Sequence, residues 1–350
     1  MAGGERPSLC GARGVGIQLS PKRSPKDGAI ASGIATTAGS MTPRLRRSGS
    51  GVSAASHTLW VRQPGRYDGS PMTRRSPYLE EILRLDPVDD HTRITQLVVC
   101  YEFPFDTTRS LEMAFFRTYA VPEIGERLDS TQEFARRAQR RYDDTDLIVS
   151  TLVEDGYDSE TGRRALRRMN QIHGRFPIAN DDFLYVLSNF VFEPVRWTDR
   201  FGWRRMVENE RLGIFHCWRE IGRRMGITDI PERYEDFERF NVEYERERFR
   251  YSDGGHRVAV ATRDMFLRWF PGLPRALGER AIYAVLDDAL LDALGFPRPT
   301  ALERRAVEAA LRLRGRALRL FPPRRSPRLR TAGRRRSYPR GWRIDELGPA

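Results

Sequence analysis

The sequence predicts an all-α protein, and three observations lead to this prediction. Beyond residue 78, apolar residues recur three and four positions apart in almost every segment, which is the period of an amphipathic helix. Prolines and glycines punctuate these segments. The only strand-like run, at 97–101, is short and isolated. We therefore expect a single helical domain at 76–320.

The expected helices follow one another along the chain. The pattern begins with a short helix at 79–83 and continues at 111–118 and 131–142. Asp158 or Ser159 can cap the next helix, which ends before Gly174 because glycine favours the position after a helix. The inner face of that helix carries Ala165, Met169, Ile172 and His173. Further helices are expected at 180–194, 203–225, 234–244, 258–270, 281–294 and 302–320.

The net charge of +13 is distributed unevenly along the 350 residues. Residues 1–75 carry twelve Lys and Arg against three Asp and Glu, and thirteen arginines with no acidic residue lie between 312 and 343. The core at 76–311 is acidic, so a basic face for specific nucleic-acid binding is not expected there. We expect disordered basic arms at 1–75 and 321–350. The patterned region starts near Met72, which suggests a translation start later in the chain than the first residue.

Nothing in the sequence predicts a membrane-spanning or secreted protein. No apolar run approaches the roughly 18 residues that cross a bilayer, and the first 30 residues lack the apolar core of a signal peptide. The three cysteines are far apart, which supports neither a disulfide framework nor a zinc site. We expect a cytoplasmic protein, with at most weak contact between its basic ends and a membrane surface.

Several enzyme classes lose support because their motifs are missing. The chain contains no Gly-x-x-x-x-Gly-Lys-Ser/Thr, no His-Glu-x-x-His, no Gly-x-Ser-x-Gly and no Glu-x-x-His pair. Phosphate-binding loops, zincins, serine hydrolases and carboxylate di-iron bundles are therefore disfavoured.

His173 is the candidate metal ligand among the five histidines. It lies four residues after Met169 and eight after Ala165, so it shares their inward face. A neutral imidazole in that position can bind a metal or haem iron. The alternative is a helix-terminal histidine stabilised by the helix dipole. His216 lies one position off the inner face of its helix and is expected to be a flanking residue.

A polar cluster at 140–145 is the second candidate feature. The residues are Arg-Arg-Tyr-Asp-Asp-Thr, and they follow a segment with the pattern of a core helix. One interpretation is a helix boundary, where Asp143 or Asp144 caps the next helix. The other is a set of polar groups that point into a pocket. The sequence pattern leaves both interpretations open.

Several motifs, taken in order, resemble a known family. They are Arg-Tyr-Asp-Asp-Thr (141–145), Gly-Tyr-Asp-Ser-Glu-Thr-Gly (156–162), Arg-Met-Asn-Gln-Ile-His-Gly (168–174), Phe-Gly-Trp-Arg (201–204) and Met-Gly-Ile-Thr-Asp-Ile-Pro (225–231). Upstream Tyr-Glu-Phe-Pro-Phe-Asp (101–106) and the final Tyr-Pro-Arg-Gly-Trp-Arg-Ile-Asp-Glu-Leu-Gly-Pro (338–349) extend the likeness. Residues 78–349 resemble the catalytic domain of the rubber oxygenase (latex clearing protein) and MpaB oxygenase family, in its MpaB-like branch.

This resemblance implies a globin-like helical fold and an oxygenase that holds haem b. The family's iron-binding histidine corresponds to His173, and the arginine and threonine on the oxygen-binding side correspond to Arg141 and Thr145. Asp144 stands where the rubber-cleaving branch has lysine, which puts oxygen handling on that side in question. The expected reaction cleaves or oxidises a small hydrophobic, isoprenoid-type or terpenoid substrate with O₂.

A second function is compatible with the same resemblance. The chain could be a non-catalytic helical binding protein that keeps the fold and associates with a membrane surface through its arginine-rich tail. The substrate and the oligomeric state do not follow from the sequence.

Overall fold

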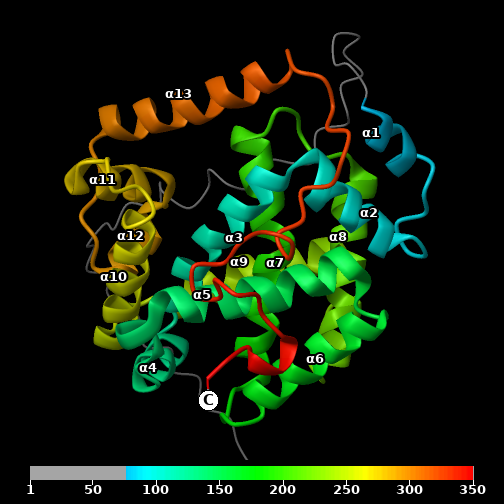
Figure 1. The fold of residues 1–350 in the computed structure, drawn as a ribbon. Coiled ribbons are helices and arrows are strands. Elements are labelled where there is room, and N and C mark those ends of the chain that lie inside the picture. Colours follow the sequence, from blue (N-terminus) through cyan, green and yellow to red (C-terminus); the bar gives the residue numbers. More distant parts are fainter. Residues whose placement is uncertain (1–75, 350) are drawn as a thin grey trace, which may run out of the picture. The chain divides into compact units, whose positions relative to one another are not determined.

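The computed structural model describes residues 76–349, and within this range every regular element is a helix (Figure 1). The all-α prediction is confirmed. The predicted basic arm at 1–75 lies outside the described residues. The elements are α1 (Pro77–Ile82), α2 (His91–Leu97), the π-helical turn η1 (Val98–Glu102), α3 (Pro104–Tyr119), α4 (Pro122–Ser130), α5 (Glu133–Thr151), the π-helical turn η2 (Leu152–Gly156), α6 (Glu160–His173), α7 (Asn180–Phe201), α8 (Glu208–Arg224), α9 (Tyr234–Arg248), α10 (Asp253–Leu267), α11 (Arg275–Val285), α12 (Asp288–Leu294), α13 (Ala301–Leu318) and the 3₁₀ turn η3 (Ile344–Glu346).

The strand-like run at 97–101 is helical, since α2 continues directly into η1. Its β-branched residues favour strands in general, but packing of the helix overrides that preference. Val98 and Cys100 are buried there, together with Leu97 at the end of α2.

Several helix boundaries differ from those predicted, and in two cases a side-chain cap is the reason. The helix expected at 203–225 starts at Glu208, because the Glu210 carboxylate accepts a 2.8 Å hydrogen bond from the backbone N–H of Val207 and caps the helix there. The segment expected at 281–294 forms two helices, because Asp287 caps α12 by accepting from the Leu290 N–H at 3.0 Å. Both caps are side-chain effects that apolar periodicity does not reveal.

The helices pack around two large apolar clusters. One contains fully buried residues of α2, α7 and α8, such as Leu97, Val191 and Ile221. The other contains residues of α3, α10 and α12, such as Phe116 and Ala259. Helix α5 contributes to both clusters, so its middle lies where they meet.

The predicted disorder after residue 320 is wrong. Residues 321–349 are ordered, and the last part of this segment crosses α5 and ends beside α6 (Figure 1). Tyr338 and Leu347 are buried, and Arg330 contacts Asp146 of α5 through an ion pair of 2.8 Å. The composition suggested a solvated arginine tail, but the acidic core supplies carboxylates that pair with these arginines.

Candidate active site

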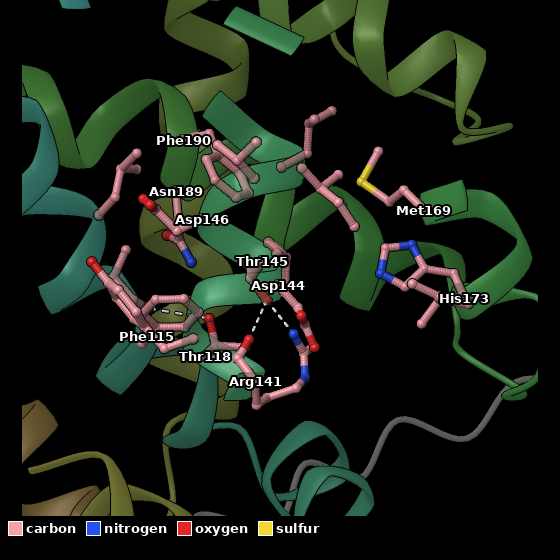
Figure 2. A pocket seen from close by; sticks show the side chains of 18 of the residues that line it. Phe115, Thr118, Arg141, Asp144, Thr145, Asp146, Met169, His173, Asn189 and Phe190 are labelled. Carbon is pink, nitrogen blue, oxygen red and sulfur yellow. Dashed lines mark hydrogen bonds between the residues drawn. The ribbon is translucent and has the colours of Figure 1, made fainter. Parts of the chain in front are cut away.

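A cavity of about 300 Å³ lies between the two apolar clusters. Its wall comes mainly from α3, α5, α6 and α7 (Figure 2). Apolar side chains dominate the wall and include Phe115, Phe134, Met169, Ile172, Phe183, Phe190 and Trp218. An apolar cavity with a few polar groups is the usual form of a small-molecule or cofactor site.

Helix α5 presents several polar side chains to this cavity, among them Arg141, Asp144 and Thr145. Their spacing of three and four residues places them on one helical face. The backbone of α5 is non-helical at Arg137, but the helix is continuous from there through 140–145 to Thr151, so the interpretation of 140–145 as a helix boundary is wrong. The alternative interpretation agrees with the structure, in which these polar groups line a pocket.

Arg141 and Thr145 form a hydrogen-bonded pair on the cavity wall (Figure 2). The Arg141 Nη1 group donates to Thr145 Oγ1, whose hydroxyl lies 3.0 Å from the backbone oxygen of Arg141 and donates to it. Within 76–349, Thr145 is the only side chain that the Arg141 guanidinium hydrogen-bonds. A guanidinium has five N–H groups, so most of its donors are left for another acceptor.

His173 is the last residue of α6 and lines the same cavity. Its ring packs edge-on against Phe183, with 5.2 Å between the ring centroids. Burial, and to a lesser extent the positive charge of Arg141, lower the pKa of His173 to about 4. The imidazole is therefore neutral at pH 7, which argues against a charged histidine stabilised by the helix dipole.

The Nδ1 atom of His173 is buried and has no hydrogen-bond partner in the described part of the chain. An unsatisfied buried polar atom costs roughly 1–3 kcal/mol, so such atoms are rare unless a ligand or water completes them. The structure thus brings the three predicted site residues, His173, Arg141 and Thr145, to one cavity.

Asp144, the departure from the rubber-cleaving pattern, contacts the C-terminal segment. The Tyr338 hydroxyl donates to Asp144 Oδ1, and the Gly348 N–H also donates to this carboxylate. Burial raises the pKa of Asp144, while both hydrogen bonds act in the opposite direction. Asp144 therefore attaches the C-terminal segment to α5, a role that a lysine, which has no acceptor, cannot fill.

The C-terminal segment forms part of the cavity wall through Gly348 and Pro349. Gly348 has a φ of +93°, and a Cβ at this position would lie 2.4 Å from Ile172 Cδ1. Only glycine fits this conformation and this close approach. Arg168 of α6 fixes the preceding residue by donating to the Leu347 carbonyl at 2.7 Å.

Glu112 is a cavity residue that the sequence did not indicate. Its Oε1 accepts from the Tyr142 hydroxyl at 2.8 Å and from Arg109 Nη2 at 2.6 Å. Burial raises its pKa to about 7, although Arg109 and Tyr142 oppose the rise. A glutamate on an amphipathic helix normally lies on the exposed face, and no local signal distinguishes this one.

The fold and the cavity define an all-helical protein with a predominantly apolar site that the neutral His173 and Arg141 face. The chain belongs to the family described as ER-bound oxygenase mpaB/B′/rubber oxygenase, catalytic domain, whose family model matches residues 111–319. The family resemblance of the sequence is thereby confirmed.

The relatives include fungal proteins. The ER-bound oxygenase mpaB′ of Penicillium brevicompactum is 26% identical over 242 residues, which cover 64% of this chain and 57% of that protein. The ER-bound oxygenase mpaB of the same organism is 32% identical over 133 residues, which cover 36% of this chain and 34% of the relative. This chain thus matches less than two thirds of either relative's length. A structure of latex clearing protein LCP in the closed state covers 71% of this chain and 73% of its own, with 15% identity and a TM-score of 0.48.

The predicted cytoplasmic location stays a prediction. Among the helices of residues 76–349, none is long and apolar enough to cross a membrane. The two Penicillium relatives are named ER-bound.

Proposed function

We propose that the protein is a haem b-dependent oxygenase that cleaves or oxidises a small hydrophobic, isoprenoid-type substrate with O₂. One observation carries this proposal: the neutral imidazole of His173, with an unpartnered Nδ1, faces an apolar cavity whose wall also carries Arg141. Family membership supports an oxygenase, and the cavity supports the choice of cofactor and substrate class.

The residues of the cavity fit a haem group. Iron binds the neutral form of imidazole, and a His173 pKa of about 4 means that no proton has to be displaced near neutral pH. The cavity wall is predominantly apolar, as the faces of a porphyrin require. His173 would hold the haem iron, and Phe183 restricts the orientation of its ring.

Bound haem would supply the activation of O₂ and the oxidation chemistry, as it does in haem oxygenases. Arg141 acts as a preorganised hydrogen-bond donor, and Thr145 positions it, because the Thr145 hydroxyl accepts from the guanidinium and donates to the backbone oxygen of Arg141. The unused N–H groups of Arg141 can stabilise negative charge as it develops on the oxygen atoms, and the hydrogen bond to Thr145 fixes the guanidinium in place. Because both groups are on one turn of α5, their spacing is set by the helix.

Other cavity residues bind the substrate and exclude water. Aromatic side chains such as Phe115 and Phe190 provide an apolar surface for an alkene chain. Glu112 can hold or release a proton at the cavity wall near neutral pH. Because its Oε1 already accepts two hydrogen bonds, the proton is carried by Oε2.

The absorption spectrum of the purified full chain from haem-supplemented cells tests this proposal. We expect a Soret band that His173→Ala abolishes and His216→Ala retains. His216 is a suitable control because it is also a partly buried helical histidine, but it does not line the cavity. Colourless wild-type protein, or an unchanged Soret band in His173→Ala, would overturn the assignment. Retention of helical circular dichroism in both variants ensures that loss of the band is not loss of the fold.

A further inference from the structure

Helix α13 (Ala301–Leu318) lies along the surface of the described part of the chain (Figure 1). Its inner face is fixed by Gly315, where a Cβ would lie 2.6 Å from the Phe201 carbonyl oxygen. This close approach holds α13 against the end of α7, and α11 packs against it as well. The face opposite Gly315 is left exposed.

The exposed face of α13 has an unusual composition. Twelve residues between 301 and 320 are exposed, and they consist of four alanines, four leucines and four arginines. Leu302, Leu313 and Leu320 are 78%, 65% and 84% exposed. Leu302 and Leu313 are eleven residues apart and lie on one line along the helix, and Leu320 follows in the turn directly after α13. Phe321, which follows immediately, is 63% exposed.

The charge on this face is entirely positive. Arg305, Arg312, Arg316 and Arg319 are exposed, and no exposed residue between 301 and 320 is acidic. The two glutamates of α13 lie at its sides and form ion pairs: Glu303 with Arg280, and Glu308 with Arg312 as well as with a residue of α7. Within residues 76–349, neither Arg305 nor Arg316 has a hydrogen-bond or ion-pair partner for its side chain.

We propose that the exposed face of α13 is a docking surface for an anionic lipid bilayer. A helix that lies in a membrane interface presents large apolar side chains flanked by Lys or Arg, so that the former enter the acyl boundary and the latter contact lipid phosphates. The leucine line of α13, with arginines beside it along its whole length, has this arrangement. The charge complementarity identifies the partner as anionic lipid.

Two other occupants fit this face less well. In a symmetric contact between two copies, the arginines of one copy would approach the arginines of the other with no carboxylate on either face. A nucleic acid would satisfy the arginines but would leave three leucines and Phe321 without an apolar partner, because phosphate contacts need only the charges. A bilayer surface accommodates both kinds of side chain.

Flotation of the full chain with vesicles tests the proposal. Wild-type protein should bind phosphatidylcholine vesicles that contain phosphatidylserine and should bind pure phosphatidylcholine vesicles weakly. R305S/R316S should reduce binding to the anionic vesicles by roughly thirtyfold, since two arginines near such a surface together contribute about one and a half powers of ten in affinity. The control R233S/R246S removes the same charge from exposed positions at the start and end of α9 and should change binding little.

The contribution of the exposed leucines to vesicle binding is tested in the same assay. L302S/L313S should weaken binding at least tenfold, whereas V88S/V242S, which removes exposed apolar side chains elsewhere, should not. All four variants change exposed residues, so circular dichroism should show an unaltered fold. The proposal is overturned if R305S/R316S binds as its control does, because other basic segments then hold the vesicle. It is equally overturned if binding is absent and sedimentation shows a dimer that L302S/L313S dissociates.

Discussion

The buried carboxyl of Glu112 should make the stability of this protein fall as the pH rises through neutrality. Burial raises the pKa of Glu112 from 4.5 to about 7. A group whose pKa is raised by folding contributes stability that is fully present below the unfolded pKa and is lost as the pH rises through the folded pKa. Replacing Glu112 by Gln removes the ionisation and keeps an acceptor for the Tyr142 hydroxyl. The variant should therefore gain stability over the wild type at alkaline pH.

The size of the effect follows from the two pKa values. One pKa unit corresponds to about 1.4 kcal/mol, so the full difference for Glu112 amounts to roughly 3 kcal/mol. At pH 5 part of the stability that the neutral Glu112 carboxyl contributes is already lost, and at pH 8 almost all of it is lost. The free energy of unfolding of E112Q minus that of the wild type should thus increase by up to about 2.5 kcal/mol between pH 5 and pH 8.

Urea unfolding followed by circular dichroism at both pH values measures this difference. E247Q, which changes an exposed glutamate of α9, controls for the loss of one negative charge. All other groups titrate alike in E112Q and the wild type, so their contributions cancel when the two free energies of unfolding are subtracted. Parallel pH dependences for E112Q and the wild type would refute the reasoning, because they would mean that Glu112 ionises freely in the folded protein.

Two further substitutions test the contacts that position the cavity. Y338F removes the hydroxyl that donates to Asp144 and should cost about 1.5–3 kcal/mol in urea unfolding, with faster tryptic cleavage of the arginine-rich C-terminal segment; unchanged cleavage would mean that other contacts hold this segment. R204M removes the guanidinium that lies between the buried carboxylates of Glu102 and Glu210, and should cost about 3–5 kcal/mol because two acids lose their partner. A loss below about 1 kcal/mol would contradict this reasoning, because it would mean that the two buried acids do not depend on the guanidinium.

Local patterns were sufficient to predict the helices that carry the site. The stripe ending at His173 predicted the face of α6 that points inward, and His173 does line the cavity. The spacing of Arg141, Asp144 and Thr145 placed them on one turn, and they share one wall. The sequence could not decide between a helix boundary and a pocket at 140–145, because aspartates serve equally as caps and as cavity residues.

The C-terminal segment shows where local reasoning failed. A segment this rich in arginine is usually a solvated tail, and the prediction of disorder was based on that composition. In the structure, Arg330 pairs with Asp146, and the Tyr338 hydroxyl donates to Asp144, which is 194 residues away in the chain. Composition does not report which distant carboxylates lie within reach of an arginine.

The sequence by itself determined the all-helical class, the family and the inward face that carries His173, because helical periodicity depends on hydrogen bonds between residues four positions apart. The tertiary structure alone decided that Tyr142 donates to Glu112 across 30 residues, and that Gly348 completes the cavity wall. These contacts depend on how separate helices pack. The pKa values of Glu112 and His173 depend on the same packing, since burial sets their direction.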